Sequence, residues 1–194
     1  MPLSKRLQQL LKRLSMLEKH FLPEEGQFSL SGNYSREQDD KTKAFLLLAH
    51  AELEAYFEDR AKNRVDVAHA HWQRAGTCTA VLSRLLVYHQ DEFEPISPHS
   101  VRKAVNYYVD KLDKNHGILE KNLLSIFLPL GLGHHDLDSR LVTACNQLGR
   151  KRGQFAHASI KTHQQVDPKS ERDNIRKNVI PELKRLDRRL RVLR

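Results

Sequence analysis

Apolar residues recur every three or four positions along most of the chain, which is the spacing of one face of an α-helix. The two ends show this pattern most clearly. The N-terminal pattern follows Ser4 and contains Leu7, Leu10, Leu14, Leu17 and Phe21. The C-terminal pattern follows Asp167-Pro168 and contains Ile175, Val179, Leu183, Leu186, Leu190 and Leu193. We therefore predict an amphipathic helix at each end of the chain.

Glycine and proline lie mainly between the helical patterns, and no internal repeat of roughly 20–50 residues is present. These features predict an all-α protein, an up-and-down bundle of about six or seven helices. The predicted helices span residues 5–22, 35–72, 78–89, 98–114, 118–128, 137–157 and 168–194. The segment 118–128 is apolar on most sides, so we expect it to lie at the centre of the bundle.

Residues that favour helix starts precede several of these segments. Ser35 is followed three residues later by Gln38, which is a capping-box pattern. The apolar stripe of this second helix is Phe45, Leu48, Ala49, Leu53 and Tyr56. Either Asp136 or Asp138 can cap the helix that carries Leu137, Leu141, Ala144 and Leu148.

Proline marks two further starts and one interruption. Ser97-Pro98 and Asp167-Pro168 each place proline at the first position of a helix, where its missing N–H is harmless. Pro181 falls inside the last helical pattern, where the missing N–H and the ring clash should produce a kink.

The chain has 194 residues, 39% of them apolar and 29% charged, which fits one globular domain over residues 1–194. No apolar run approaches the ~18 residues of a membrane helix. Residues 1–6 lead into an amphipathic pattern and not into the apolar core of a secretory signal, so we predict a cytoplasmic protein. Cys78 and Cys145 lie in apolar helical patterns and are predicted to be reduced core residues.

The formal net charge of +9 comes from the basic amphipathic helices at the ends, residues 1–22 and 168–194. Residues 1–20 hold five basic and one acidic side chain, and residues 169–194 hold ten and four. One interpretation is a surface that attracts the phosphates of nucleic acid, with fast and salt-dependent binding. The alternatives are two solvated helix faces without a ligand, or helices that lie on a membrane surface.

Arg152 and His157 form an Arg-x4-His pair, which could cleave RNA without a metal ion. A histidine with a near-neutral pKa can take the proton of a ribose 2′-hydroxyl, and a guanidinium can stabilise the charge that grows on the attacked phosphate. Spacing alone carries little weight, because Arg64–His69 and Arg84–His89 have the same spacing.

Two features of the surroundings favour the pair at 152 and 157. The apolar stripe that contains Leu148 next reaches Arg152, so this arginine should be at least half-buried and should need a partner. Gly149 and Gly153 flank it and allow a backbone or a phosphate to approach closely. The alternative is that Arg152 extends into solvent and that His157 is an ordinary surface histidine.

A second arginine competes for the same role. Arg150, Gln154, His157 and Lys161 share one face of an ideal helix, whereas Arg152 and His157 stand roughly 140° apart. The pairing Arg150-x6-His157, supported by Gln154, therefore stays open.

The run Leu148-Gly149-Arg150-Lys151-Arg152-Gly153-Gln154-Phe155-Ala156-His157 resembles the Arg-x4–6-His end of HEPN domains, which are small helical bundles. The segments before it resemble those of the RiboL-PSP and MAE-type HEPN groups, and the segment 51–56 resembles their acidic early helix. The upstream matches are His116-Gly117-Ile118, Asn122-Leu123-Leu124, Leu128-Pro129-Leu130-Gly131 and Leu137-Asp138. The resemblance covers roughly residues 44–190.

The resemblance implies a metal-independent endoribonuclease that dimerises so that two motifs face one cleft. It implies products with 2′,3′-cyclic phosphate and 5′-hydroxyl ends, and a role as a toxin or phage-defence effector. Arg152 would bind the phosphate and His157 would be the general acid/base. Gly153 stands where many active members have Asn or another polar residue.

Acidic residues of the second helix could hold the arginine. Glu52, Glu54 and Glu58 are candidates for a charge-assisted pair with it, although such spacing is also typical of a solvated helix face. His69 and His71 are two residues apart, which places them on different helix faces, so we predict no metal site and no cofactor.

We therefore favour an enzyme with RNA as substrate, a homodimer with a composite active site, and an antitoxin or another regulatory partner. The alternative is a non-catalytic HEPN-like module that binds a protein or nucleic acid, with Arg152 in a structural ion pair.

Overall fold

The computed structural model describes residues 2–89, 95–157 and 165–193, without the side chains of Ala156 and His157. These residues form helices and turns and contain no strand, so the predicted all-α class is confirmed. The α-helices are α1 (Lys5–Phe21), α2 (Arg36–Ala75), α3 (Ala80–His89), α4 (Pro98–Asp113), α5 (Glu120–Phe127), α6 (Ser139–His157), α7 (Pro168–Asn174) and α8 (Ile180–Val192).

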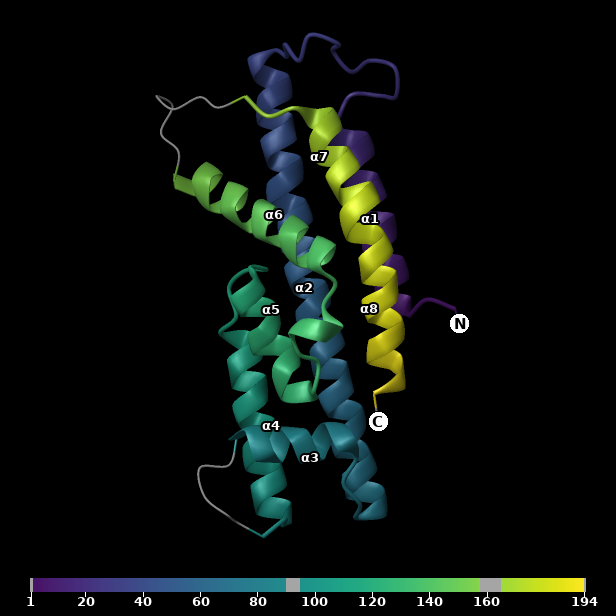
Figure 1. Ribbon diagram of the computed structural model, residues 1–194, viewed down its shortest axis with the longest axis vertical. Coiled ribbons are helices and arrows are strands. Elements are labelled where there is room, and N and C mark those ends of the chain that lie inside the picture. The colour runs from purple at the N-terminus through teal and green to yellow at the C-terminus, as the bar shows by residue number, and fades with distance from the viewer. Residues whose placement is uncertain (1, 90–94, 158–164, 194) are drawn as a thin grey trace.

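Helix α2 is the axis of the molecule, and the other helices pack around it (Figure 1). Helices α1 and α8 run antiparallel to each other along one side, while α4 and α5 lie along another. Helix α3 crosses one end of α2, and α6 crosses it obliquely before extending away from the bundle. This arrangement leaves the outer part of α6 with few neighbours.

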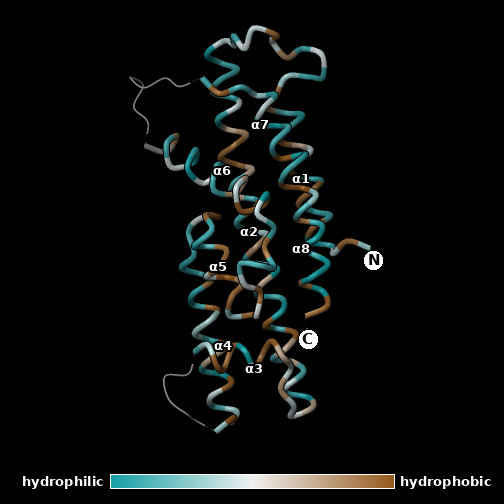
Figure 2. The backbone as a smooth tube through the Cα atoms, viewed as in Figure 1, coloured by the Kyte–Doolittle hydropathy of each residue, from teal (hydrophilic) through white to brown (hydrophobic). Residues whose placement is uncertain are grey.

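One continuous cluster of buried apolar side chains fills the space between the helices. The predicted stripe of α1 is buried at Leu7, Leu10, Leu14 and Leu17, and α2 buries four of its five predicted positions. Leu48 is the exception, with 37% of its surface exposed. Figure 2 shows the result along α1 and α8, where hydrophobic turns interrupt mainly hydrophilic helices. Such a single core is what a one-domain chain requires, and the domain assignment itself stays a prediction.

The helix starts predicted after Ser4, Ser35, Ser97 and Asp167 are confirmed, and the side-chain oxygen of each of these residues accepts a backbone N–H of the first turn. The capping box predicted at Ser35 is wrong in one of its two hydrogen bonds, the one from the Gln38 side chain back to Ser35. The Gln38 amide does not reach back to Ser35 but donates to the carbonyl of Phe21 at 3.0 Å, and it thereby ties the start of α2 to the end of α1.

Asp138, and not Asp136, caps α6, because its carboxylate accepts the N–H of Arg140 at 2.9 Å. Asp136 stabilises a short 3-10 turn, His134–Asp136, because its carboxylate accepts the backbone N–H of Gly133 at 3.0 Å. The segment between α5 and α6 is therefore held by two separate aspartates.

The C-terminal helical path, where a kink was predicted at Pro181, contains a π-helical turn at Ile175–Val179, just before that proline. The N–H of Ile180 bonds to the carbonyl of Ile175, five residues earlier. Because proline cannot donate the next helical hydrogen bond, the wider turn absorbs the defect and α8 resumes after it.

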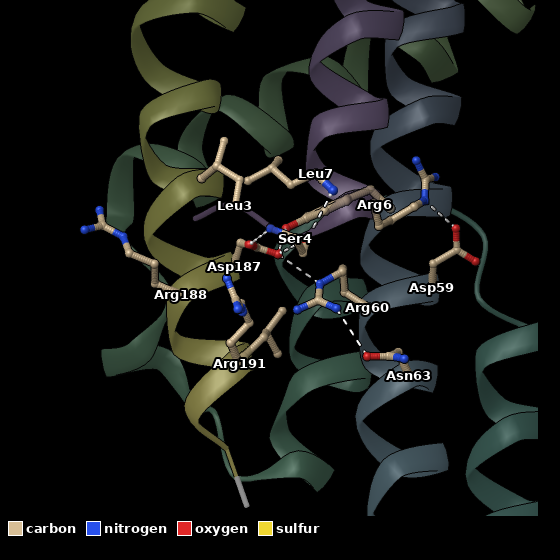
Figure 3. Close-up of polar contacts among 12 residues, drawn as sticks. Leu3, Ser4, Arg6, Leu7, Asp59, Arg60, Asn63, Asp187, Arg188 and Arg191 are labelled. Atoms are coloured by element: carbon tan, nitrogen blue, oxygen red, sulfur yellow. Dashed lines mark hydrogen bonds and ion pairs between the residues drawn. The ribbon is translucent and has the colours of Figure 1, made fainter. Parts of the chain in front are cut away.

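A buried ion pair fastens α8 to α1 and α2 (Figure 3). The fully buried carboxylate of Asp187 accepts the backbone N–H of Ser4 at 2.9 Å and its hydroxyl at 2.6 Å. Tyr56 donates its hydroxyl to Asp187 at 3.3 Å, and the Arg60 guanidinium, 7% exposed, lies 3.0 Å from the same oxygen. Burial, and then the charge of Asp187, raise the pKa of Tyr56. Three elements that are distant in the sequence are thus joined at one buried charge.

The two cysteines have different surroundings. Cys145 is buried in α6, and burial raises the pKa of its thiol to about 12, so it is an unreactive core residue as predicted. Cys78 lies in the turn before α3 and is only half-buried, so its placement within a helix was wrong. Both thiols are free.

Candidate active site at the crossing of α2 and α6

A polar stripe runs along the side of α2 where α6 crosses. Lys43, His50, Glu54 and Glu58 are spaced by seven, four and four residues, which places them on one face of the helix. This face lies beside the buried apolar stripe and not opposite it, because His50 is only 3% exposed. The stripe therefore brings titratable groups to the edge of the core.

The turn between α4 and α5 binds the acidic part of this stripe. Gly117 donates its N–H to Glu54, and Asn115 donates its amide to Glu58 at 2.8 Å. Asn122 donates to Asn115 at 3.1 Å and fixes the orientation of that amide. Gly117 has a φ of +125°, a conformation that favours glycine, so the turn depends on this residue.

Burial shapes the chemistry of the two side chains at the centre of the stripe. Loss of solvent is the main cause of a lowered pKa at His50; the charge of Arg152 lowers it further, and Glu54, 3.7 Å away, opposes both. Burial is likewise the main cause of a raised pKa at Glu58, which is partly offset by the hydrogen bond from Asn115. His50 is therefore neutral near pH 7.

Helix α6 leaves the core after Leu148, the last of its described residues that is buried. Gly149 allows the close approach of Leu119, since a Cβ on Gly149 would lie 2.8 Å from the Leu119 Cδ2 atom. A Cβ on Gly153 would meet nothing within 4 Å, so the space beside this residue is open in the described chain.

The position of Arg152 corrects one sequence-based expectation. Arg152 is exposed, and the inward positions that follow Leu148 are taken by Lys151 and Phe155. Lys151 forms an ion pair with the buried Glu171 of α7, and Lys43 lies 5.9 Å from the centre of the Phe155 ring. A step of three residues after Leu148 reaches Lys151 as readily as a step of four reaches Arg152, and in the folded protein Lys151 is the residue that meets Glu171.

The expected charge-assisted pair between Arg152 and a glutamate of α2 is not formed within the described residues. Glu52 pairs with Arg13 of α1 at 3.0 Å, which turns it away from α6. Glu54 accepts the N–H of Gly117, and Glu58 accepts the amide of Asn115. Arg152 thus lies close enough to affect His50 by its charge and keeps its guanidinium available to a ligand.

The other candidate residues lie on the same outer part of α6. Arg150 and Gln154 are exposed, and Arg152 is the residue of α6 whose charge contributes to the lowered pKa of His50. His157 is the last residue of α6, and its side chain lies outside the described part of the chain, as does Lys161.

The sequence analysis did not identify His50 as a candidate site residue. The signal that could have found it is the series His50, Glu54 and Glu58, with each residue four positions after the previous one. The apolar pattern around His50 hid this signal, because a histidine next to a core stripe is more often a buried structural residue.

Elsewhere, the described histidines have separate neighbours. His71 lies 3.1 Å from the hydroxyl of Thr77, and His134 lies 3.2 Å from Glu120. Within residues 2–89, 95–157 and 165–193, no group of three or more His, Cys, Asp or Glu side chains could hold a metal ion. None of the described helices is both long and apolar enough to cross a membrane.

Lowering the pH from about 7.5 to about 5.5 should destabilise the wild type more than a His50→Gln variant. An unfolded chain protonates histidine near its ordinary pKa of about 6.5, whereas the lowered pKa in the fold keeps His50 neutral. Above about pH 6.5, His50 is neutral in both the folded and the unfolded state and does not lower the stability of the fold. As the pH falls below this value, the unfolded state binds a proton that the folded state does not, so the free energy of unfolding decreases. Urea unfolding at both pH values measures the loss of unfolding free energy for the wild type and for His50→Gln. Equal losses in the two proteins would contradict a lowered pKa of His50.

A helical bundle with an Arg-x4–6-His motif near the end of a late helix has the features of a HEPN domain. The RiboL-PSP-HEPN family model matches residues 5–186, and the chain belongs to this family. Comparisons with curated proteins and with solved structures gave no match.

Proposed function

We propose that this protein is a metal-independent endoribonuclease whose active residues are Arg152 and His157. The observation that carries the proposal is the exposure of Arg152 on the outer part of α6, where it forms no ion pair with a described residue and lies five residues before His157, the last residue of that helix. Membership of the RiboL-PSP-HEPN family supports it, because HEPN domains often have ribonuclease-like activity.

The reaction transfers a phosphoryl group within the RNA. A neutral histidine takes the proton of the 2′-hydroxyl, the 2′-oxygen forms a bond to the adjacent phosphorus, and the bond to the 5′-oxygen breaks. A protonated histidine donates a proton to that leaving oxygen, which gives a 2′,3′-cyclic phosphate and a 5′-hydroxyl. Arg152 stabilises the negative charge on the phosphoryl oxygens in the transition state, with Arg150 and Gln154 beside it as supporting residues.

Two copies of His157 would supply the base and the acid, so we include a homodimer in the proposal. The outer part of α6 is the surface for this contact, since none of its described residues beyond Leu148 is buried and the space beside Gly153 is open. A cytoplasmic toxin or phage-defence effector held by an antitoxin or regulatory partner is the biological setting that we propose.

The test is incubation of labelled single-stranded and structured RNA with purified protein in excess EDTA, with His157→Ala as the matched inactive control. We expect cleavage by the wild type alone, products with cyclic phosphate ends, and a dimer at micromolar concentration by sedimentation. Cleavage that EDTA abolishes would contradict the mechanism. A monomer would contradict the composite site.

Gly153, in place of a polar residue, favours a second candidate, a non-catalytic module that binds RNA or a protein. Salt-sensitive binding of RNA without cleavage, by a folded dimer in the same assay, would support this module and overturn the nuclease.

A further inference from the structure

In the folded protein, the acidic side chains of α1 and α8 point inward, whereas many of their basic side chains point outward. Helices α1 and α8 contain three acidic residues, and their side chains are all turned inward: Glu18 is 20% exposed, Glu182 1% and Asp187 0%. Glu18 pairs with Arg176, and Glu182 with Arg140 and Arg185. The outer face of these two helices therefore carries basic side chains, and the acidic side chains that lie near them in the sequence are absent from it.

The cations that remain on this face are exposed. They make no ion pair with any described residue, and they lie at helical intervals of seven on α1 and of four and three on α8. They are Lys5, Lys12, Lys19, Lys184, Arg188 and Arg191. Arg191 donates to the backbone carbonyl of Pro2, and Figure 3 shows Arg188 directed away from Asp187. We call these six residues the basic face.

The two helices present this face together, because they lie side by side in opposite directions. Ser4 contacts Asp187 at one level, and Glu18 contacts Arg176 about four helical turns further along α1. Lys5 and Lys19 are about 21 Å apart at 1.5 Å per residue, so the basic face is an elongated track and not a single pocket.

We infer that the basic face binds the sugar–phosphate backbone of an RNA strand. An elongated row of exposed, unneutralised cations fits a ligand with evenly repeated negative charges. A lipid surface fits less well, since Met16 and Val192 are the only large apolar side chains of α1 and α8 with substantial exposure. Insertion into a bilayer would need a broader apolar side.

This inference goes beyond the proposed function, because the basic face binds RNA whether or not Arg152 and His157 cleave it. The face belongs to α1 and α8, and the candidate active site lies where α6 crosses α2. In a cleaving protein the basic face raises the affinity for long RNA. In a non-cleaving protein it is itself the binding site.

The experiment measures binding of labelled single-stranded RNA by fluorescence anisotropy at several salt concentrations. All proteins carry His157→Ala, so that cleavage does not affect the result. The test variant is Lys12→Gln/Lys184→Gln/Arg188→Gln. The control variant, Arg74→Gln/Arg102→Gln/Lys103→Gln, removes the same charge from exposed cations at the α3 end of the bundle that form no ion pair with described residues.

We expect the test variant to bind at least about tenfold more weakly at 0.1 M salt, and its salt slope to decrease by about 2, or roughly 0.7 per lost phosphate contact. The control variant should stay within about threefold of its parent. Equal weakening of both variants would overturn the inference in favour of a general charge effect. If the test variant lost binding to anionic vesicles while its RNA binding stayed unchanged, the inference would be overturned, and a lipid surface would be the ligand of the basic face.

Discussion

Replacing Asp187 with alanine should lower the free energy of unfolding by about 3–5 kcal/mol, which is a large part of the stability of a small domain. Asp187 is fully buried and is the charge that offsets Arg60, which is 7% exposed. Its removal leaves this guanidinium without a counter-ion away from water. It also removes the acceptor for the N–H and hydroxyl of Ser4, the N-cap of α1.

Urea unfolding followed by circular dichroism measures this loss. The matched control is Asp59→Ala, which removes an ion pair with Arg6 at 2.6 Å in which Asp59 is 58% exposed. Exposed pairs contribute about 1 kcal/mol or less, so the control should change little. If both variants lost the same small amount, the buried cluster would not be what fastens α8 to α1 and α2.

Replacing Arg152 with alanine should reduce the rate of RNA cleavage by about 100- to 1000-fold, the usual cost of removing a group that stabilises transition-state charge. This prediction rests on the proposed function. Arg150→Ala is the matched comparison, because both arginines are exposed residues of α6. Since Arg150 is a supporting residue in the proposal, we expect Arg150→Ala to reduce the rate much less than Arg152→Ala does.

Single-turnover cleavage with excess enzyme measures the chemical step, and thermal unfolding shows whether the variants are folded. Arg152→Lys should restore only part of the rate, because an ammonium group cannot make the two parallel hydrogen bonds that a guanidinium makes to a phosphate. A severe loss in Arg150→Ala, with normal cleavage by Arg152→Ala, would favour the rival pairing of Arg150 with His157.

The described helices follow the sequence closely where one local signal decides the backbone. Ser4 caps α1, Ser97 caps α4, and Asp167 caps α7, because a short oxygen-bearing side chain can satisfy free N–H groups without help from the rest of the chain. Pro181 lies in the first turn of α8, directly after the π-helical turn, where its missing N–H is tolerated. These features could be predicted because their causes lie within a few residues.

The errors occur where a side chain has more than one partner within reach. Gln38 could bond to Ser35, but the end of α1 lies nearby and its Phe21 carbonyl takes the amide instead. Arg152 could continue the apolar stripe, but Lys151 occupies the inward position and pairs with Glu171 of α7. Neither competing partner is close in sequence, so no local pattern could reveal which contact forms.

By itself, the sequence determined the helical class, most helix boundaries, the apolar faces and the motif that resembles a HEPN site, because these depend on neighbouring residues. Tertiary structure alone decided that His50 is buried and that the acidic side chains of α1 and α8 face inward. Burial and charge pairing depend on which helices meet and at what angle. Those distances arise only after the chain has packed.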